Sequence, residues 1–187
     1  RRRIDTHLEG FRQLGAAVRT NGAYLFKTAK RLEAQRILLD EASVTATENI
    51  IMAAVLAKGT TSLYNTACEP HVQDLCRMLN AMGAKIAGIG TNRLTIEGVE
   101  SLHGTEQRIG PDYIDAGSYL AAALVTGGEL TVEDVEPADF EVLERPFKRF
   151  GVRWSIDPGT KTLRLPARQR LKTAYDLGDA IPKIEDG

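Results

Sequence analysis

The chain has 187 residues, and 24 Lys and Arg against 25 Asp and Glu give a formal net charge of −1. This near-neutral charge argues against a general nucleic-acid or membrane-surface binder, although a local anion site is compatible with it. Seventeen Gly and seven Pro are an ordinary share, which excludes collagen-like and low-complexity chains. No apolar run approaches the ~20 residues of a membrane span, no signal peptide is visible, and two cysteines fit a reducing compartment. We therefore expect a cytoplasmic globular protein with a substantial core.

Three glycines, Gly15, Gly83 and Gly151, are spaced 68 residues apart, and each lies between two apolar residues. After each glycine the pattern predicts two short strands joined by a turn that contains Asn-Gly, Gly-Thr-Asn or Asp-Pro-Gly. The predicted strand pairs are 17–18 with 24–26, 85–87 with 94–96, and 152–156 with 163–165. The spacing therefore indicates an internal repeat.

The elements that precede the second and third glycines also correspond. The sequence predicts Ala-rich helices at 48–57 and 114–126, strands at 60–64 and 129–133, and helices that begin at Pro70 and Ala138. Pro146 should kink or shorten the last of these helices. Each unit is then β-α-β-α-β-β, and the first copy keeps only its final helix and hairpin. We expect the chain to begin inside a unit of something longer.

The cysteines and histidines show no catalytic or metal-binding pattern. Cys76 lies on the apolar stripe of the helix from Pro70, which favours a packing role, and Cys68 precedes the start of that helix without a paired histidine. His7, His71 and His103 are far apart and lack the spacing of metal ligands. We expect no metal site and no cofactor.

One candidate anion site lies at residues 39–49, where a strand ends near Asp40 and a helix begins within 43–47. Free amides and hydroxyls at a helix start, together with the helix dipole, favour an anion. The alternative is purely structural: Ser43 or Thr45 caps the helix, and Glu48 completes a capping box.

A second candidate site lies at residues 2–7. Arginine side chains stack on planar bases and bind phosphate with two hydrogen bonds, and Asp5 could accept a hydrogen bond from an imide N–H. The alternative is a solvated segment with a helix start at Asp5 or Thr6.

These segments resemble one known family. Arg2-Arg3-Ile4-Asp5-Thr6-His7-Leu8 resembles the R-P-V-D-L-H-I stretch of the UDP-N-acetylglucosamine enolpyruvyl transferases (1-carboxyvinyltransferases). Further family motifs follow in the same order, most densely between residues 38 and 127. They are S-V-x-A-T-E-N-I at 43–50, A-x-G-T-T at 57–61, E-P at 69–70, L-x-x-x-G-A-K-I at 79–86, G-T-D at 90–92, I-E-G-V at 96–99 and P-D-R-I at 111–114.

The resemblance implies an α/β fold of two similar domains, each with three β-α-β-α-β-β units in an inside-out barrel with central helices. The 68-residue period is what this fold would produce. We expect residues 1–175 to form one such domain, with a partial first unit and two further units. Residues 176–187 are then a linker towards a second domain of the same parent chain.

The resemblance also implies a reaction that needs no cofactor. The family moves an enolpyruvyl group from phosphoenolpyruvate to the 3-hydroxyl of UDP-N-acetylglucosamine and releases phosphate, in the first committed step of peptidoglycan synthesis. The family's mobile-loop cysteine would lie just before Arg1, and other reacting groups belong to the other domain. We therefore expect no catalytic residue in this chain and no activity from the chain alone.

By the same resemblance, two strips hold the nucleotide sugar. The strip that holds the uridine is Arg2, Arg3, Ile4, Asp5 and Thr6, and the strip near the uracil and diphosphate is Glu41, Ala42, Ser43 and Val44. The sequence departs from the family pattern at several positions, and Glu41 is the most consequential, because a carboxylate replaces a frequent lysine beside a dianion. The other departures are Arg3 for proline, Thr6 for leucine, Thr45 for glycine, Cys68 for arginine, His71 for glutamate and Tyr113 for arginine.

Two other functions remain open at this point. A shikimate-phosphate enolpyruvyl transferase shares the architecture but has no nucleotide for the strip at residues 2–6 to hold. A non-catalytic paralogue could keep the barrel and bind another anion at 43–47, and the carboxylate of Glu41 favours that alternative.

Overall fold

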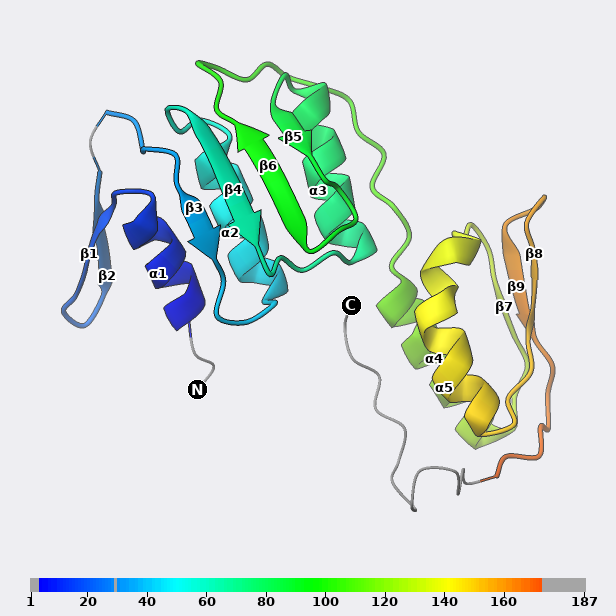
Figure 1. Ribbon diagram of the computed structural model, residues 1–187. Helices are drawn as coiled ribbons and strands as arrows, with labels where there is room; N and C mark the ends of the chain where they lie inside the picture. Colours follow the sequence, from blue (N-terminus) through cyan, green and yellow to red (C-terminus); the bar gives the residue numbers. More distant parts are fainter. Residues whose placement is uncertain (1–3, 29, 173–187) are drawn as a thin grey trace. The chain divides into compact units, whose positions relative to one another are not determined.

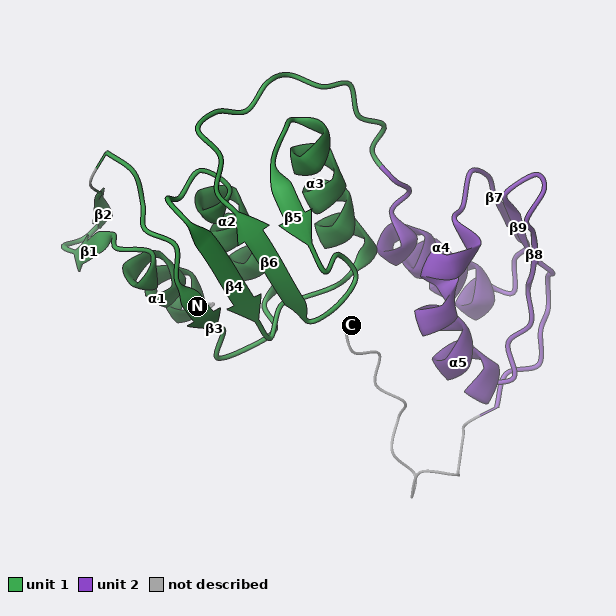
Figure 2. Ribbon diagram, turned by 45° about the horizontal axis from the view of Figure 1, so that its top comes forward, with its two compact units in different colours: residues 1–109 green, residues 110–187 purple. Residues whose placement is uncertain are grey.

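The computed structural model describes residues 4–28 and 30–172, which fall into two compact units (Figure 2). The first unit ends at Ile109 and the second begins at Gly110. The expected domain over 1–175 contains both units, and the expected linker at 176–187 lies outside the described residues.

The first unit opens with a helix and a hairpin. α1 (Asp5–Gln13) begins at Asp5, which confirms one of the two predicted start positions. β1 (Ala17–Thr20) and β2 (Tyr24–Lys27) pair antiparallel, as predicted, with Ala17 opposite Lys27. Phe26 of the hairpin meets Phe11 of α1 edge to face, with ring centroids 5.3 Å apart. This aromatic contact ties the otherwise exposed hairpin to the helix.

A four-stranded mixed sheet with two helices on one face forms the rest of the first unit (Figure 1). Its strands are ordered β3-β4-β6-β5, with β3 parallel to β4 and the remaining pairs antiparallel. The strands are β3 (Arg36–Leu38), β4 (Thr60–Tyr64), β5 (Lys85–Ala87) and β6 (Arg93–Glu97), and the helices are α2 (Val44–Ala54) and α3 (Pro70–Ala81). Residues alternate between buried and exposed along β6, so one face of the sheet meets the helices and the other meets solvent.

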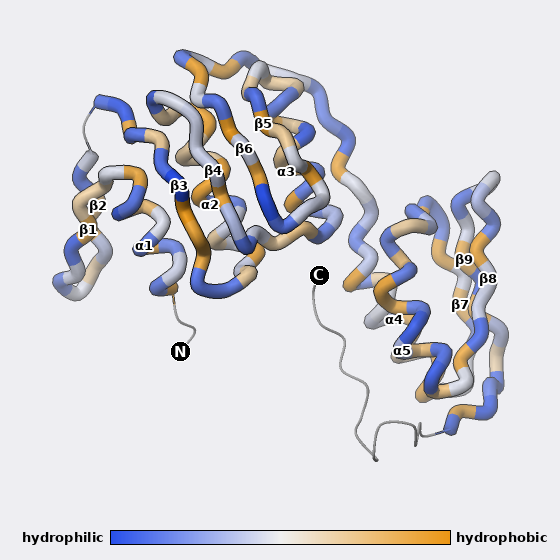
Figure 3. Tube along the Cα trace, in the orientation of Figure 1, coloured by the Kyte–Doolittle hydropathy of each residue, from blue (hydrophilic) through white to orange (hydrophobic). Residues whose placement is uncertain are grey.

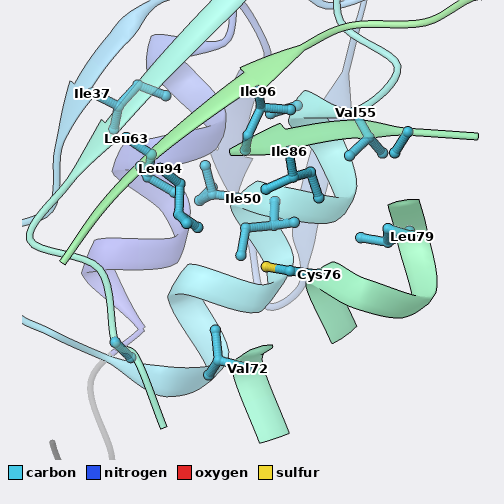
Figure 4. Close-up of a cluster of buried hydrophobic side chains, with 14 of the residues drawn as sticks. Ile37, Ile50, Val55, Leu63, Val72, Cys76, Leu79, Ile86, Leu94 and Ile96 are labelled. Atoms are coloured by element: carbon cyan, nitrogen blue, oxygen red, sulfur yellow. The ribbon is translucent and has the colours of Figure 1, made fainter. Parts of the chain in front are cut away.

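The core of this unit lies between the sheet and the two helices. Figure 3 shows the long hydrophobic stretches along β3 and α2 that supply part of it. Ile37, Leu63 and Ile96 from the strands are fully buried, as is Ile50 from α2. Figure 4 shows Cys76 pointing from α3 into this cluster, where it is 1% exposed. The predicted packing role of Cys76 is confirmed.

The second unit has its own sheet and core. It consists of α4 (Tyr113–Thr126), β7 (Leu130–Val132), a 3-10 turn η1 (Pro137–Phe140), α5 (Glu141–Arg149), β8 (Ser155–Asp157) and β9 (Thr162–Leu165). The strands form an antiparallel sheet ordered β7-β9-β8. Leu120, Phe140, Leu143 and Leu163 lie at the centre of the buried cluster.

Some predicted boundaries were wrong. The helix start predicted within 43–47 is confirmed, since α2 begins at Val44, but the helix predicted to reach residue 57 ends at Ala54. It ends early because the backbone of Lys58 pairs with another segment, donating to the Leu32 carbonyl at 2.8 Å and accepting from the Ala34 amide at 2.9 Å. The helix predicted from Ala138 begins as the turn η1, and α5, which contains Pro146, has 9 residues against 12 in α3.

The three glycines of the 68-residue spacing end three helices in the same way. Gly15, Gly83 and Gly151 have positive φ angles of 92°, 99° and 79°, in the region that glycine adopts most readily. In each case the glycine amide donates three residues back, to Arg12, Asn80 and Lys148 at 2.9, 3.0 and 2.9 Å. The next amide donates five residues back, to Phe11, Leu79 and Phe147 at 3.0, 2.9 and 3.2 Å. Each turn is followed by a strand: β1 begins two residues after Gly15, β5 two residues after Gly83, and β8 four residues after Gly151.

Candidate functional site

The structure brings the two predicted strips into contact. Thr6, in the first turn of α1, is 4% exposed. Its hydroxyl donates to the Asp40 carboxylate and lies 3.4 Å from Oε1 of Glu41, both in the turn between β3 and α2. Of the predicted residues, Thr6 therefore contacts Glu41, 35 positions further along the sequence, and Ile4 and Asp5 directly precede Thr6 in the chain. Arg2 and Arg3 lie outside the described residues.

Ser43 begins α2 as its N-cap, with an extended backbone at φ −78° and ψ 122°. The hydroxyl of Ser43 accepts from the Ala46 amide at 3.4 Å, and its carbonyl accepts from the Thr47 amide at 2.9 Å. The predicted cap at Ser43 is confirmed, but the predicted capping box is wrong. The box requires an acidic residue at the third helical position, which is Ala46, whereas Glu48 is the fifth.

His7 forms a second link between α1 and α2. Its Nδ1 lies 2.9 Å from Nδ2 of Asn49, and its Nε2 lies 3.3 Å from the hydroxyl of Thr45. An amide nitrogen can only donate, so Nδ1 of His7 accepts from Asn49. Sequence reasoning treated the histidines only as possible metal ligands and missed this role. Asp40 was used only to mark the end of a strand, and its contact with Thr6 was also missed.

α1 and α2 approach closely at Gly10 and Ile50, and this approach brings the two segments of the candidate site together. A Cβ atom on Gly10 of α1 would lie 2.4 Å from Cδ1 and 2.6 Å from Cγ1 of Ile50, which is fully buried in α2. Only glycine allows this approach without a shift of the Ile50 side chain or of one helix. One turn further towards the start of α1, the same approach places Thr6 and His7 against the first residues of α2 and the turn before it.

The cysteines do not form a nucleophilic site in the described residues. Burial raises the pKa of the Cys76 thiol to about 11, and the nearby Glu48 carboxylate acts in the same direction against the Arg77 guanidinium. Cys68 is half-buried immediately before α3, and its carbonyl accepts from Nε2 of Gln73 at 2.7 Å. A thiol with so high a pKa as that of Cys76 remains protonated at neutral pH and is a poor nucleophile.

Residues 4–28 and 30–172 hold no group of three or more His, Cys, Asp or Glu side chains arranged to bind a metal ion. In the same described ranges, no helix has both the length and the apolar character that crossing a membrane demands.

Solved structures with a similar fold include enolpyruvyl transferases. The enolpyruvyl transferase NikO from Streptomyces tendae superposes with a TM-score of 0.76 over 90% of this chain and 43% of its own, at 22% identity. EPSP synthase from Acinetobacter baumannii superposes with a TM-score of 0.64 over 88% of this chain and 40% of its own, at 21% identity. These likenesses define the fold as the mixed α/β fold of that class.

The family is defined by sequence. Residues 1–180 match the EPSP synthase (3-phosphoshikimate 1-carboxyvinyltransferase) family, and the chain belongs to that family. It is 55% identical to the UDP-N-acetylglucosamine 1-carboxyvinyltransferase of Treponema denticola, 51% to that of Treponema pallidum and 47% to that of Bacteroides thetaiotaomicron. Each match covers the whole of this chain, which spans 43% of the length of these relatives.

Proposed function

We propose that this chain is part of an enzyme that transfers an enolpyruvyl group from phosphoenolpyruvate to the 3-hydroxyl of UDP-N-acetylglucosamine and releases phosphate. Relatives that are about half identical over the whole chain carry the name of that transferase. The reaction would serve peptidoglycan synthesis in the cytoplasm. Residues outside this chain, including a second domain, would supply the groups that carry out the chemistry.

Within this enzyme, the described chain contributes part of the nucleotide-sugar site. The observation that carries this proposal is the contact of Thr6 with Asp40 and Glu41, because it joins the two segments that the family resemblance assigns to the nucleotide. Asp5 begins α1 at this junction, and Ser43 begins α2 with its first amides available to a diphosphate. Arg2 and Arg3 precede Asp5 in sequence and would add the positive charge that the described part of the site lacks.

We also propose that the chain is built from copies of one β-α-β-α-β-β unit with a period of 68 residues, arranged in an inside-out barrel. Residues 36–97 contain all six elements in that order. The matching pairs of hydrogen bonds after α1, α3 and α5 support the same relationship for the flanking copies.

An EPSP synthase-type reaction, with shikimate 3-phosphate as the acceptor, is the second candidate, because the family and one structural neighbour carry that name. A comparison of acceptors separates the two reactions. The full-length protein is mixed with phosphoenolpyruvate and either acceptor, and phosphate release is measured. We expect release with UDP-N-acetylglucosamine and none above background with shikimate 3-phosphate. The reverse result would assign the second reaction, and release with neither acceptor would favour a non-catalytic paralogue.

A further inference from the structure

The second unit contains an open cavity of about 770 Å³ that the proposed reaction does not use. Its walls come from the last two turns of α5, from residues 151–154 and from the segment that follows β9, where Arg170 and Lys172 lie. This volume is in the range of sites that hold small organic ligands.

Positive charge dominates the lining of this cavity. Lys148, Arg153, Arg170 and Lys172 line it against a single carboxylate, Glu144, which is paired with Lys148 at 2.7 Å. Within residues 4–28 and 30–172, no acidic side chain pairs with the other three cations. Three cations without an acidic partner around one hollow favour a ligand with several negative charges.

An aromatic side chain forms part of the same wall. Trp154 is half-buried and meets Phe147 of α5 with ring centroids 5.4 Å apart and an interplanar angle of 64°. This edge-to-face packing fixes the indole in place while the ring still lines the cavity. An indole held beside unpaired guanidinium groups is a surface on which a planar base can stack.

Hydrogen bonds attach the segment that follows β9 to residues 150–153. The side-chain amide of Gln169 accepts from the Arg153 amide at 2.7 Å and donates to the Arg153 carbonyl at 2.8 Å. The Lys172 amide donates to the Phe150 carbonyl at 3.0 Å. The segment that carries Arg170 is therefore attached along the segment that carries Arg153 and Trp154, so the cations and the indole form one preorganised surface.

We propose that this cavity binds a nucleoside polyphosphate. The phosphates lie against Arg153, Arg170 and Lys172, where guanidinium groups can each make two charge-assisted hydrogen bonds, and the base stacks on Trp154. The site requires nothing from residues 2–6 or 41–44, so it stands whether or not those residues bind a nucleotide sugar.

The test uses the full-length protein and calorimetric titration with ATP and, separately, with inorganic tripolyphosphate. We expect one ATP per chain, with tighter binding for ATP than for tripolyphosphate and with affinity that falls between about 50 and 200 mM salt. In the double variant Arg153→Ala/Arg170→Ala the affinity for ATP should fall at least about tenfold. Both side chains are exposed, so their removal leaves the core intact. In Trp154→Leu the affinity should fall about fivefold for ATP and remain the same for tripolyphosphate.

The matched control is Arg164→Ala, which removes an exposed cation on β9 that does not line the cavity. This control should bind ATP as the parent protein does. No ATP binding up to about 1 mM would overturn the proposal. An equal loss in Arg164→Ala would also overturn it. Equal affinity for ATP and tripolyphosphate would show that the base contributes nothing to binding, and would overturn the proposal of a nucleoside ligand. None of these results depends on phosphate release, so the proposed reaction and this site can fail separately.

Discussion

The hydroxyl of Thr6 donates a hydrogen bond to the carboxylate of Asp40, 34 residues further along the chain. Thr6 is buried and Asp40 is exposed, so the bond connects the interior of the α1–α2 packing to the surface of the β3–α2 turn. Glu41 approaches the same hydroxyl at 3.4 Å. One buried hydroxyl thereby orients the Asp40 carboxylate, with the Glu41 carboxylate beside it, at the start of the proposed nucleotide site.

Thr6→Val should keep the shape of the side chain and remove this hydrogen bond. We expect the free energy of unfolding to fall by about 1–2 kcal/mol, since a bond to a charged acceptor is lost but the exposed Asp40 carboxylate regains water. Denaturant unfolding of the full-length protein measures the change. Thr6→Ser keeps the donor and is the matched control. An unchanged free energy of unfolding in Thr6→Val would show that this hydrogen bond does not stabilise the fold.

Asp5→Ala should weaken binding of UDP-N-acetylglucosamine by about 1.5–3 kcal/mol, because a carboxylate that accepts an imide N–H makes a charge-assisted hydrogen bond. Titration calorimetry with the full-length protein measures this affinity. Asp5→Asn retains an acceptor oxygen without the charge and should fall between the parent and the alanine variant. An alanine variant that binds as tightly as the parent would remove Asp5 from the site.

Glu41→Gln should strengthen binding of the same nucleotide sugar. A carboxylate at this place repels the diphosphate, and glutamine removes the repulsion while it keeps the shape of the side chain. We expect a gain of about 0.5–1 kcal/mol at low salt that shrinks as the ionic strength rises, because the side chain is exposed. Glu9→Gln, an exposed carboxylate further along α1, should change the affinity little. A weaker affinity in Glu41→Gln would mean that the carboxylate itself binds the ligand.

Local signals in the sequence predicted most of the elements. Pro70 at the first position of α3 and Gly127 in a left-handed conformation after α4 mark helix ends by their own backbone preferences. The start of α2 was predicted within 43–47, although the β-branched residues of 44–47 are weak helix formers. Tertiary packing decides that start instead: Ala46 and Thr47 are buried, and the Thr47 hydroxyl accepts from the Ala67 amide at 3.1 Å.

The two segments of the candidate site could be predicted from the sequence, but the contact between them could not. The helix starts at Asp5 and Ser43 carry local signals, so each strip was visible in the sequence. The link between them depends on the approach of α1 to α2 at Gly10, which has no sequence signal beyond one glycine in a helix. For the same reason, the contacts that His7 makes with Asn49 and Thr45 could not be predicted from spacing.

Gly10→Ala should destabilise the protein by about 1–3 kcal/mol, because the new methyl group overlaps the buried Ile50 side chain. Gly104→Ala is the matched control, since a Cβ there meets nothing within 4 Å. The double variant Gly10→Ala/Ile50→Ala should lose less stability than the sum of the two single variants, because the Cβ of residue 50 lies 3.9 Å away, at an ordinary contact distance. Additive losses, measured by denaturant unfolding, would show that the two residues do not clash.

Cys76 should make the free energy of unfolding fall as the pH rises above 9. Burial raises the pKa of this thiol from 9.0 to about 11, so the folded state keeps a proton that the unfolded state releases. The contribution is therefore complete below pH 9 and is lost as the pH rises towards 11, with a loss of about 1 kcal/mol between pH 8 and 10. Cys76→Ala should lose less stability over the same interval, whereas Cys68→Ala should behave as the parent does. Urea unfolding at both pH values measures the difference, and an identical pH dependence in parent and Cys76→Ala would contradict it.

In the native parent, a thiol reagent at pH 8 should modify Cys68 and reach Cys76 only on unfolding, because Cys76 is both buried and protonated.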